Sequence, residues 1–288
     1  MPLTLRKLHP MYGVEIVGVD VAKPVDDATF GEIRAALDEH SLLLFRGLDM
    51  TDERQIAFSE RFGPLLRATS NNLTGGTPFS RQSNLDVKTG AFIPADDKRM
   101  RYQKANEQFH SDGSYRVVPA LCSLLSGRVV PPEGGATEIT TMRGAWDALP
   151  EARRRPLDGL IAVHSLFHSR SLVDPTVMSE AQKEEMPPVR QAVVRTNPVN
   201  GRKTLFVGAH ASHIAGWPVD EGRALLTELL AFCAQPQFVY RHQWREGDLV
   251  VYDNRCLLHR GTPYDIARHK RVLQRTTVSD SGPTAPQE

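Results

Sequence analysis

Short segments with the character of β-strands recur along the chain and constrain its fold more than any other feature. Most are a few residues long, rich in aliphatic or β-branched residues, and bounded by predicted turns. The chain contains 21 glycines and 20 prolines, which favour such turns. We expect strands at 3–5, 14–17, 41–45, 121–130, 137–141, 160–164, 191–196, 204–207, 238–241, 249–252 and 272–278. Helical spacing of apolar residues is limited to a segment that begins at Asp27 and to 51–62, 142–155 (with a break at Pro150) and 219–234. This pattern favours a β-sandwich or barrel with helices packed outside it over a doubly wound parallel sheet.

One long segment lacks a regular pattern. From about residue 63 to 108 the chain shows little periodicity and includes Asn71-Asn72-Leu73-Thr74-Gly75-Gly76-Thr77-Pro78. A connection of this length in a compact domain is more often an active-site lid than an idle linker, with disorder as the alternative. We therefore expect one domain over residues 1–288, a lid at about 63–108 and a frayed tail at 279–288.

Charge and cysteine content narrow the class of protein. Lys and Arg number 35 against 34 Asp and Glu, so the net charge of +1 gives no global reason to expect nucleic acid or a membrane surface as a partner. Cys122, Cys233 and Cys256 include no CxxC pair, which argues against a disulfide framework and a structural zinc site. No apolar stretch reaches the roughly 18 residues of a membrane span. We expect a cytoplasmic protein with a small-molecule partner.

A histidine and a carboxylate two residues apart, His110 and Asp112, form the first part of a candidate metal site. The triplet alone arises easily by chance, and a histidine is more often a structural residue than a ligand. Among the ten histidines, however, His259 follows an apolar strand and a polar turn. Two histidines and one carboxylate are the ligand set of a facial triad, whose open positions suit non-haem Fe(II). The candidate ligands are therefore His110, Asp112 and His259.

Two arginines four residues apart, Arg271 and Arg275, lie at the start of the last predicted strand and within it. Residues at this spacing share one face of a strand. Both side chains could then enter one cavity, where guanidinium groups bind carboxylates through two parallel hydrogen bonds.

Together, the ordered motifs of the chain resemble those of a known enzyme family. Four ordered motifs are similar to those of the taurine dioxygenase and 2,4-dichlorophenoxyacetate dioxygenase family of Fe(II)/2-oxoglutarate enzymes: Phe109-His110-Ser111-Asp112, Pro132-Glu133-Gly134-Gly135-Ala136-Thr137, Tyr252-Asp253-Asn254-Arg255 leading to His259, and Arg271 with Arg275. The similarity spans nearly the whole chain, is closer to the 2,4-dichlorophenoxyacetate branch, and is weakest over 63–108. It implies a mostly β fold with flanking helices, namely a double-stranded β-helix (jelly roll) barrel with a lid-like insertion.

The resemblance also implies roles for individual residues. His110, Asp112 and His259 would bind iron, Thr137 and Arg271 would hold the distal carboxylate of 2-oxoglutarate, and Arg275 would lie near the cosubstrate and the anionic head of the substrate. Related halogenases carry a small residue in place of the carboxylate ligand, so Asp112 indicates oxygen transfer rather than halide transfer.

Further contacts are expected around the pocket. Asn106 and Tyr115 resemble pocket-lining positions of the family and are candidates for substrate contact, as is His210. For His210 and His213 the more common role of a histidine, as a supporting or surface group, remains the alternative. Asp253 or Asn254 could orient the ligating imidazoles.

The leading hypothesis is an Fe(II)- and 2-oxoglutarate-dependent dioxygenase, with O2 as second cosubstrate, that hydroxylates a small anionic substrate. The resemblance favours an aryloxyacetate, cleaved to a phenol and glyoxylate. Three alternatives stay open: a taurine, alkylsulfonate or alkyl sulfate ester dioxygenase; a metal-binding sensor or non-catalytic barrel; and a hydrolytic zinc enzyme, which would need only one open metal position. The sequence does not distinguish a monomer from a homo-oligomer.

Overall fold

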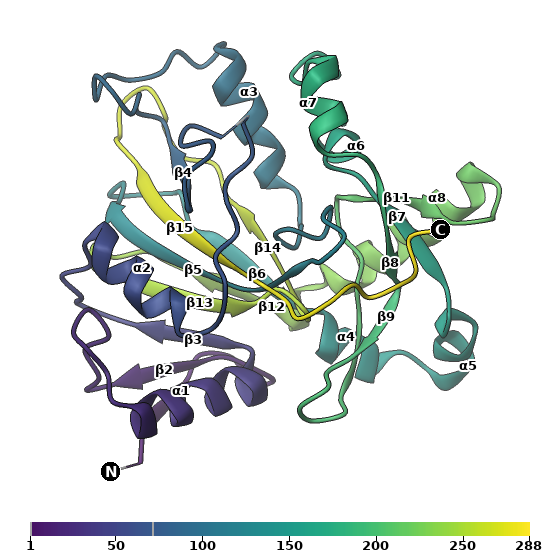
Figure 1. Cartoon of the computed structure of the whole chain (residues 1–288), viewed down its shortest axis with the longest axis horizontal. Coiled ribbons are helices and arrows are strands. Elements are labelled where there is room, and N and C mark those ends of the chain that lie inside the picture. The colour runs from purple at the N-terminus through teal and green to yellow at the C-terminus, as the bar shows by residue number, and fades with distance from the viewer. Residues whose placement is uncertain (1, 71) are drawn as a thin grey trace.

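The computed structural model describes residues 2–70 and 72–288, and its largest sheet has seven strands (Figure 1). Met1 and Asn71, which belong to the predicted domain and lid, lie outside the described residues. The strands follow the order β1 (Thr4–Lys7), β2 (Val14–Val17), β3 (Leu42–Phe45), β13 (Leu249–Asp253), β5 (Ala120–Val129), β15 (Val272–Ser279) and β4 (Phe79–Ser83). Neighbours are antiparallel except for the parallel pair β2 and β3.

A smaller antiparallel sheet packs against the large one. Its strand order is β12 (Val239–His242), β6 (Thr137–Thr141) and β14 (Leu257–Gly261). Leu44 and Leu125 of the large sheet share one buried cluster with Ile139 and Leu257 of the small sheet. Two antiparallel sheets with a common core are the arrangement of a jelly roll.

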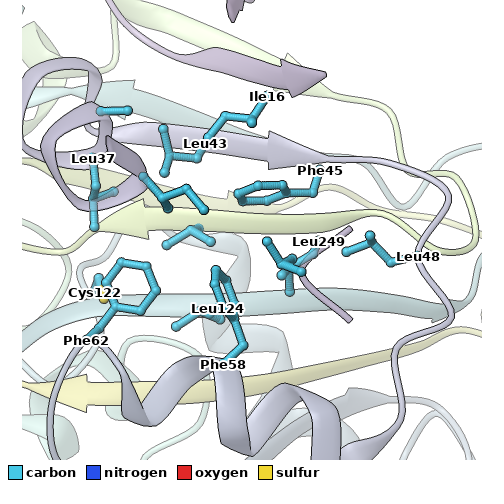
Figure 2. Close-up of a cluster of buried hydrophobic side chains, with 14 of the residues drawn as sticks. Ile16, Leu37, Leu43, Phe45, Leu48, Phe58, Phe62, Cys122, Leu124 and Leu249 are labelled. Atoms are coloured by element: carbon cyan, nitrogen blue, oxygen red, sulfur yellow. The ribbon is translucent and has the colours of Figure 1, made fainter. Parts of the chain in front are cut away.

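Two helices cover the other face of the large sheet, at the lower left of Figure 1: α1 (Asp27–His40) and α2 (Asp52–Glu60). The side chain of Asp26 caps α1 by accepting from the amide of Thr29, and α1 ends at Ser41, which adopts a left-handed φ of 65°. Figure 2 shows the apolar cluster between these helices and the sheet, where the Phe58 ring of α2 meets Phe45 of β3 edge-on at a centroid distance of 6.0 Å.

Phe45→Ala is expected to lower the free energy of unfolding by about 3–5 kcal/mol, because the substitution removes buried apolar surface and leaves a cavity. Phe45 has no exposed surface. Denaturant unfolding would measure the loss. Val199→Ala is the matched control, since Val199 is 64% exposed and its truncation should change stability by less than about 0.5 kcal/mol. Equal effects of the two substitutions would contradict the assignment of this core.

A second apolar cluster lies beside the jelly roll, among further helices and short sheets. Two small sheets contribute, β11 (Ala211–Ile214) with β7 (Ile161–His164) and β8 (Val189–Ala192), and β10 (Lys203–Leu205) with β9 (Val194–Thr196). The helical elements are α4 (Met142–Ala148), α5 (Glu151–Arg154), η2 (Arg155–Leu157), α8 (Val219–Cys233) and η3 (Pro236–Phe238). The predicted helix at 142–155 is confirmed with its break at Pro150, since proline cannot continue α4.

The segment 63–108 contains regular elements that its sequence did not indicate. They are β4, α3 (Lys98–Lys104) and η1 (Ala105–Glu107). β4 pairs with β15 at the edge of the large sheet. Its sequence, Phe79-Ser80-Arg81-Gln82-Ser83, has no β-branched residue, so pairing with a neighbour rather than local preference makes it a strand.

Two other parts of the chain also carry more structure than expected. The region after β7 contains α6 (Leu166–Ser171) and α7 (Glu180–Glu185), which lie at the same end of the molecule as α3 in Figure 1. Within 279–288, predicted to be frayed, the hydroxyl of Thr284 accepts from the Ala192 amide at 3.0 Å, and Gln287 accepts from the Arg190 amide at 3.1 Å. The tail therefore runs beside β8.

No helix in the described ranges combines the length and apolar character needed to cross a bilayer.

Candidate active site

His110 and His259 lie opposite each other on adjacent antiparallel backbone segments. The His110 amide donates to the His259 carbonyl at 3.1 Å, and the His259 amide donates to the His110 carbonyl at 2.9 Å. This pairing holds the two imidazole rings at a centroid distance of 4.3 Å. His259 lies beyond the end of the strand at 249–252, as the sequence had indicated, and belongs to a further strand, β14, that the sequence had not indicated. Sheet pairing thus brings together two ligand candidates that are far apart in sequence.

Asp112 completes the group, and several side chains fix its carboxylate. Oδ2 accepts hydrogen bonds from the hydroxyls of Ser123 and Tyr252, each at 2.8 Å. Oδ1 contacts the guanidinium of Arg275. The Asn254 side chain accepts from the Asp112 amide at 3.1 Å and donates to the Ser123 hydroxyl at 2.9 Å. These contacts restrict the carboxylate to one orientation.

The three side chains converge as ligands of one cation would. Their donor atoms lie within 4.8 Å of one another, and all three residues are buried. The His110 and His259 Nε2 atoms are 3.8 and 3.7 Å from the Asp112 oxygens, too far for good hydrogen bonds. Nδ1 of His110 donates to the Gln108 carbonyl at 2.8 Å, which leaves the lone pair on Nε2. The geometry fits a shared divalent cation, and two imidazoles with one carboxylate suit Fe(II).

The pKa values of the three side chains also fit a bound divalent cation. Burial, followed by the nearby His259, lowers the pKa of His110 to about 3, and burial lowers the pKa of His259 to about 4. Burial alone would raise the pKa of Asp112, but Arg275 and the two histidines hold that pKa well below its usual range. At neutral pH the imidazoles are therefore neutral and the carboxylate is charged, which is the protonation state that a bound metal requires.

One pocket beside the triad has the features of a site for a dicarboxylate. It is lined by Thr137 and Arg271 together with His110, His259 and Arg275. Thr137 belongs to β6 of the small sheet, while Arg271 directly precedes β15 of the large sheet, so the two sheets face each other across the pocket. Arg271 and Arg275 both line this pocket, as their spacing had suggested.

The Arg271 guanidinium retains unused donors in this pocket. Nη2 donates to the Gly135 carbonyl at 3.1 Å, while the buried Nε has no partner. Burial lowers the pKa of Arg271 to about 10, so the group is still charged at neutral pH. Gly135 leaves space for it, because a Cβ at this position would approach Arg271 Nε to 3.3 Å and Pro131 Cγ to 2.9 Å. A charged guanidinium with spare donors is suited to a carboxylate ligand.

Thr137 also has a directed hydroxyl. The indole Nε1 of the buried Trp244 donates to Thr137 Oγ1 at 2.9 Å. An indole N–H can only donate, so Thr137 Oγ1 accepts here and keeps its own hydrogen for another partner. Trp244 thereby leaves the hydroxyl hydrogen of Thr137 free to donate into the pocket that Thr137 and Arg271 line.

A second pocket borders the triad at His110 and Asp112. The four residues predicted to contact substrate, Asn106, Tyr115, His210 and Arg275, all line it, whereas His213 lines neither pocket that borders the triad. It also contains Tyr102, Arg170 and several residues of the segment 63–108. The structure therefore brings together every predicted substrate contact.

Local backbone geometry explains how His210 reaches this pocket. The segment before it passes close to Phe109 and His110, where the Ala209 amide donates to the Phe109 carbonyl at 2.9 Å. A Cβ at Gly208, which has a φ of 141°, would meet Leu258 Cδ2 at 3.0 Å. Burial, and then His110, lowers the pKa of His210 well below the usual value, so this side chain is neutral.

Sequence reasoning missed several residues of the site. Tyr252 and Ser123 lie in predicted strands that are buried on both faces, so no polar alternation marks which side chain points to the metal. Trp244 lies outside the four motifs that carry the resemblance, and no role was predicted for it. Arg170 lies outside every predicted strand and helix, where no local signal separates it from surface arginines. Of Asp253 and Asn254, Asn254 supports Asp112, while Asp253 accepts from Arg255.

Comparison with known proteins gives consistent results. Residues 4–277 match the family described as taurine catabolism dioxygenase TauD, TfdA family. The chain is 41% identical to the alpha-ketoglutarate-dependent 2,4-dichlorophenoxyacetate dioxygenase of Cupriavidus pinatubonensis, over 98% of this chain and 99% of that protein. It is 35% identical to an (S)-phenoxypropionate/alpha-ketoglutarate dioxygenase of Sphingobium herbicidovorans, over 96% and 94% of the two chains.

Solved structures agree with the fold. The crystal structure of AAD-2 in complex with Mn(II) and N-oxalylglycine superposes with a TM-score of 0.94 at 37% identity, covering 99% of this chain and all of that one. The jelly-roll prediction is thereby confirmed. With its His-Asp-His site, the protein is a 2-oxoglutarate-dependent dioxygenase whose cofactor is Fe(II). The chain belongs to the taurine catabolism dioxygenase TauD, TfdA family.

Proposed function

We propose that this dioxygenase hydroxylates a small aryloxyacetate at the carbon beside the ether oxygen. The product is a hemiacetal, which collapses to a phenol and glyoxylate, while 2-oxoglutarate and O2 give succinate and carbon dioxide. The observation that carries the proposal is a pocket at the triad with both aromatic and cationic walls, formed by Tyr102, Tyr115, Arg170 and Arg275. Two relatives that the chain resembles are named for aryloxy-acid substrates.

In this proposal the three triad residues hold Fe(II). When bound, the metal supplies the oxidising chemistry that couples decarboxylation of 2-oxoglutarate to substrate hydroxylation. The protein fixes the ligands: the Gln108 carbonyl holds the His110 ring, and Ser123 with Tyr252 holds the Asp112 carboxylate. Substrate contacts are assigned to Asn106, Tyr115, His210 and Arg275, which line the second pocket.

Thr137 and Arg271 are assigned to the distal carboxylate of 2-oxoglutarate. Each has a free donor in the pocket that also contains His110 and His259. Arg275 lies beside the same pocket and pairs with Asp112, so it contributes positive charge near the cosubstrate. The dicarboxylate would thus lie between the metal ligands and Arg271.

The segment 63–108 is proposed to act as a lid of a single domain. It contributes Leu66, Thr69, Gln82, Tyr102 and Asn106 to the wall of the substrate pocket. Because this segment is the part least similar to the family, we assign to it much of the selectivity for the aryl group.

Trp244→Phe is expected to raise the KM for 2-oxoglutarate by about 3- to 10-fold, because Thr137 loses the donor that orients its hydroxyl. The KM for the substrate should stay within about twofold. Steady-state assays of succinate formation would measure both constants. Trp217→Phe is the matched control, since Trp217 is 41% exposed and lines neither pocket. An unchanged 2-oxoglutarate KM in Trp244→Phe would remove this role.

The proposed substrate class is tested by one comparative assay. Purified protein with Fe(II), ascorbate and 2-oxoglutarate is supplied in turn with phenoxyacetate, 2,4-dichlorophenoxyacetate, taurine and hexyl sulfate. We expect succinate and phenol to form in equal amounts with the two aryloxyacetates. Turnover of taurine or hexyl sulfate alone would replace the proposed substrate and leave the cofactor chemistry intact.

A further inference from the structure

We propose that Arg170 binds the anionic head of the substrate, an inference that rests on the proposed function. Arg170 lies in α6 and is only 7% exposed. It lines the same pocket as His110 and Asp112, so a ligand in that pocket could reach both the guanidinium and the metal site. No motif or spacing in the sequence indicates this role.

The Arg170 guanidinium has only neutral partners among the described residues. Nη1 donates to the Tyr102 carbonyl at 3.2 Å and to the side-chain oxygen of Asn106 at 2.9 Å, while the buried Nε has no partner. Asn106 is oriented in turn by Gln82, to which its amide donates at 2.7 Å. No carboxylate of the described chain lies within 4.0 Å of Arg170. A buried cation without a counter-ion is costly, so this position is suited to an anionic ligand.

The other arginines of the pocket are less suited to the task. Arg275 already has a carboxylate partner in Asp112. Arg67 is exposed and donates to the Gly76 carbonyl, and Arg116 donates to the Arg67 carbonyl. An ion pair with an exposed arginine is weakened by water and salt. Arg170 therefore offers both burial and unused donors.

The guanidinium is also held rigidly. Its Cζ lies 4.3 Å from the centroid of the Tyr102 ring, which adds a cation–π contact to the two hydrogen bonds. Tyr102 and Asn106 come from α3 and η1, whereas Arg170 comes from α6. These helices lie at one end of the molecule in Figure 1. A fixed guanidinium loses little freedom on binding, which favours recognition of a planar carboxylate.

The arrangement of arginines around the triad also supports a substrate role for Arg170. Arg271, in the first pocket, and Arg170, in the second, each retain an unpartnered buried Nε. Arg275, which lines both pockets, has an unpartnered Nε as well, but its charge is already paired with Asp112. The proposed reaction requires two anions, a dicarboxylate cosubstrate and an anionic substrate. One unneutralised arginine is therefore available for each of them.

The test measures ligand binding without turnover. Under anaerobic conditions, substrate is titrated into the complex of protein, Fe(II) and 2-oxoglutarate, and the change in its visible absorption band gives the Kd. The probes are phenoxyacetate and the neutral phenoxyacetamide. The variants are Arg170→Met, which replaces a buried charge with an apolar chain, and Arg170→Lys, which keeps the charge but loses the planar guanidinium with its paired donors. Arg153→Gln is the control, because Arg153 pairs with Glu228 at the surface.

We expect Arg170→Met to raise the Kd of phenoxyacetate on the order of 10- to 100-fold and to leave the Kd values of phenoxyacetamide and 2-oxoglutarate within about twofold. Arg170→Lys should show a smaller loss of at least about threefold, and Arg153→Gln none. If Arg170→Met retains normal phenoxyacetate binding, the inference is overturned. If that variant does not fold by circular dichroism, Arg170→Lys decides, and unchanged binding there overturns it.

Failure of the proposed function gives a different result. If wild-type protein does not bind phenoxyacetate, the titration is repeated with taurine and hexyl sulfate. An anion that binds wild type and binds Arg170→Met or Arg170→Lys more weakly supports the role of Arg170 while the aryloxyacetate proposal falls. If neither anion binds wild type, or if the variants bind it normally, the role of Arg170 falls as well.

Discussion

Asp112→Ala is expected to reduce iron-dependent turnover by more than about 100-fold, since loss of a residue that merely supports a metal ligand already costs 10- to 100-fold. The substitution removes the only carboxylate among three converging donors. Without it, two neutral imidazoles remain, and they bind divalent iron weakly. Succinate formation at saturating 2-oxoglutarate, together with metal analysis of the desalted protein, would measure the effect.

The design must separate loss of a ligand from loss of folding. Removing Asp112 also leaves the Arg275 guanidinium without its buried partner, which by itself is destabilising. Asp112→Asn keeps one oxygen that can accept from Arg275, and its NH2 group can donate to the hydroxyl oxygens of Ser123 and Tyr252, so it should fold and still lack activity. Ser123→Ala removes one support and should retain measurable turnover. Normal iron-dependent activity in Asp112→Asn would refute the assignment of this carboxylate as a ligand.

Arg271→Ala is expected to raise the KM for 2-oxoglutarate by at least about 10- to 100-fold, because the distal carboxylate loses a charged donor in a sheltered pocket. The KM for the substrate should change much less, because Arg271 does not line the substrate pocket. Arg271→Lys should give an intermediate value, since it keeps the charge but not the two-pronged geometry. Assays of succinate formation over a wide range of 2-oxoglutarate would yield these constants.

Arg268→Ala is the matched control for this prediction. Arg268 lies three residues earlier in the same loop, is exposed, and lines neither pocket. It should leave both KM values within about twofold. If Arg271→Ala retained the wild-type KM for 2-oxoglutarate, the cosubstrate carboxylate would have to bind elsewhere, and Arg275 would be the next candidate.

Most of the β-strands and the longer helices follow from local patterns. β3, β5 and β13 appear as apolar runs, and α8 appears as an apolar stripe, because burial selects such residues directly. The elements that were missed include β4, α3, α6 and α7, which are short and mostly polar, and two short strands, β11 and β14. Their structure depends on neighbours supplied by the rest of the fold, as when β4 pairs with β15.

The candidate metal ligands and carboxylate-binding residues could be identified from the sequence for a chemical reason. Metal ligands and carboxylate-binding groups require particular residue types, so His110, Asp112, His259, Thr137 and Arg271 could be selected by motif and by resemblance. The tertiary structure decided how these groups are held: His259 pairs with His110 across two strands, and Tyr252 donates to Asp112. Such contacts join residues far apart in the chain, where no spacing rule applies.

Arg170 shows more clearly which site residues the sequence alone does not identify. The sequence by itself determined the chemistry of the metal and cosubstrate side, because that chemistry fixes which residues must be present. Only the tertiary structure decided that an arginine from α6 enters the substrate pocket with no carboxylate beside it. Burial and the absence of a counter-ion are properties of the surrounding fold, and they turn an ordinary arginine into a candidate for substrate recognition.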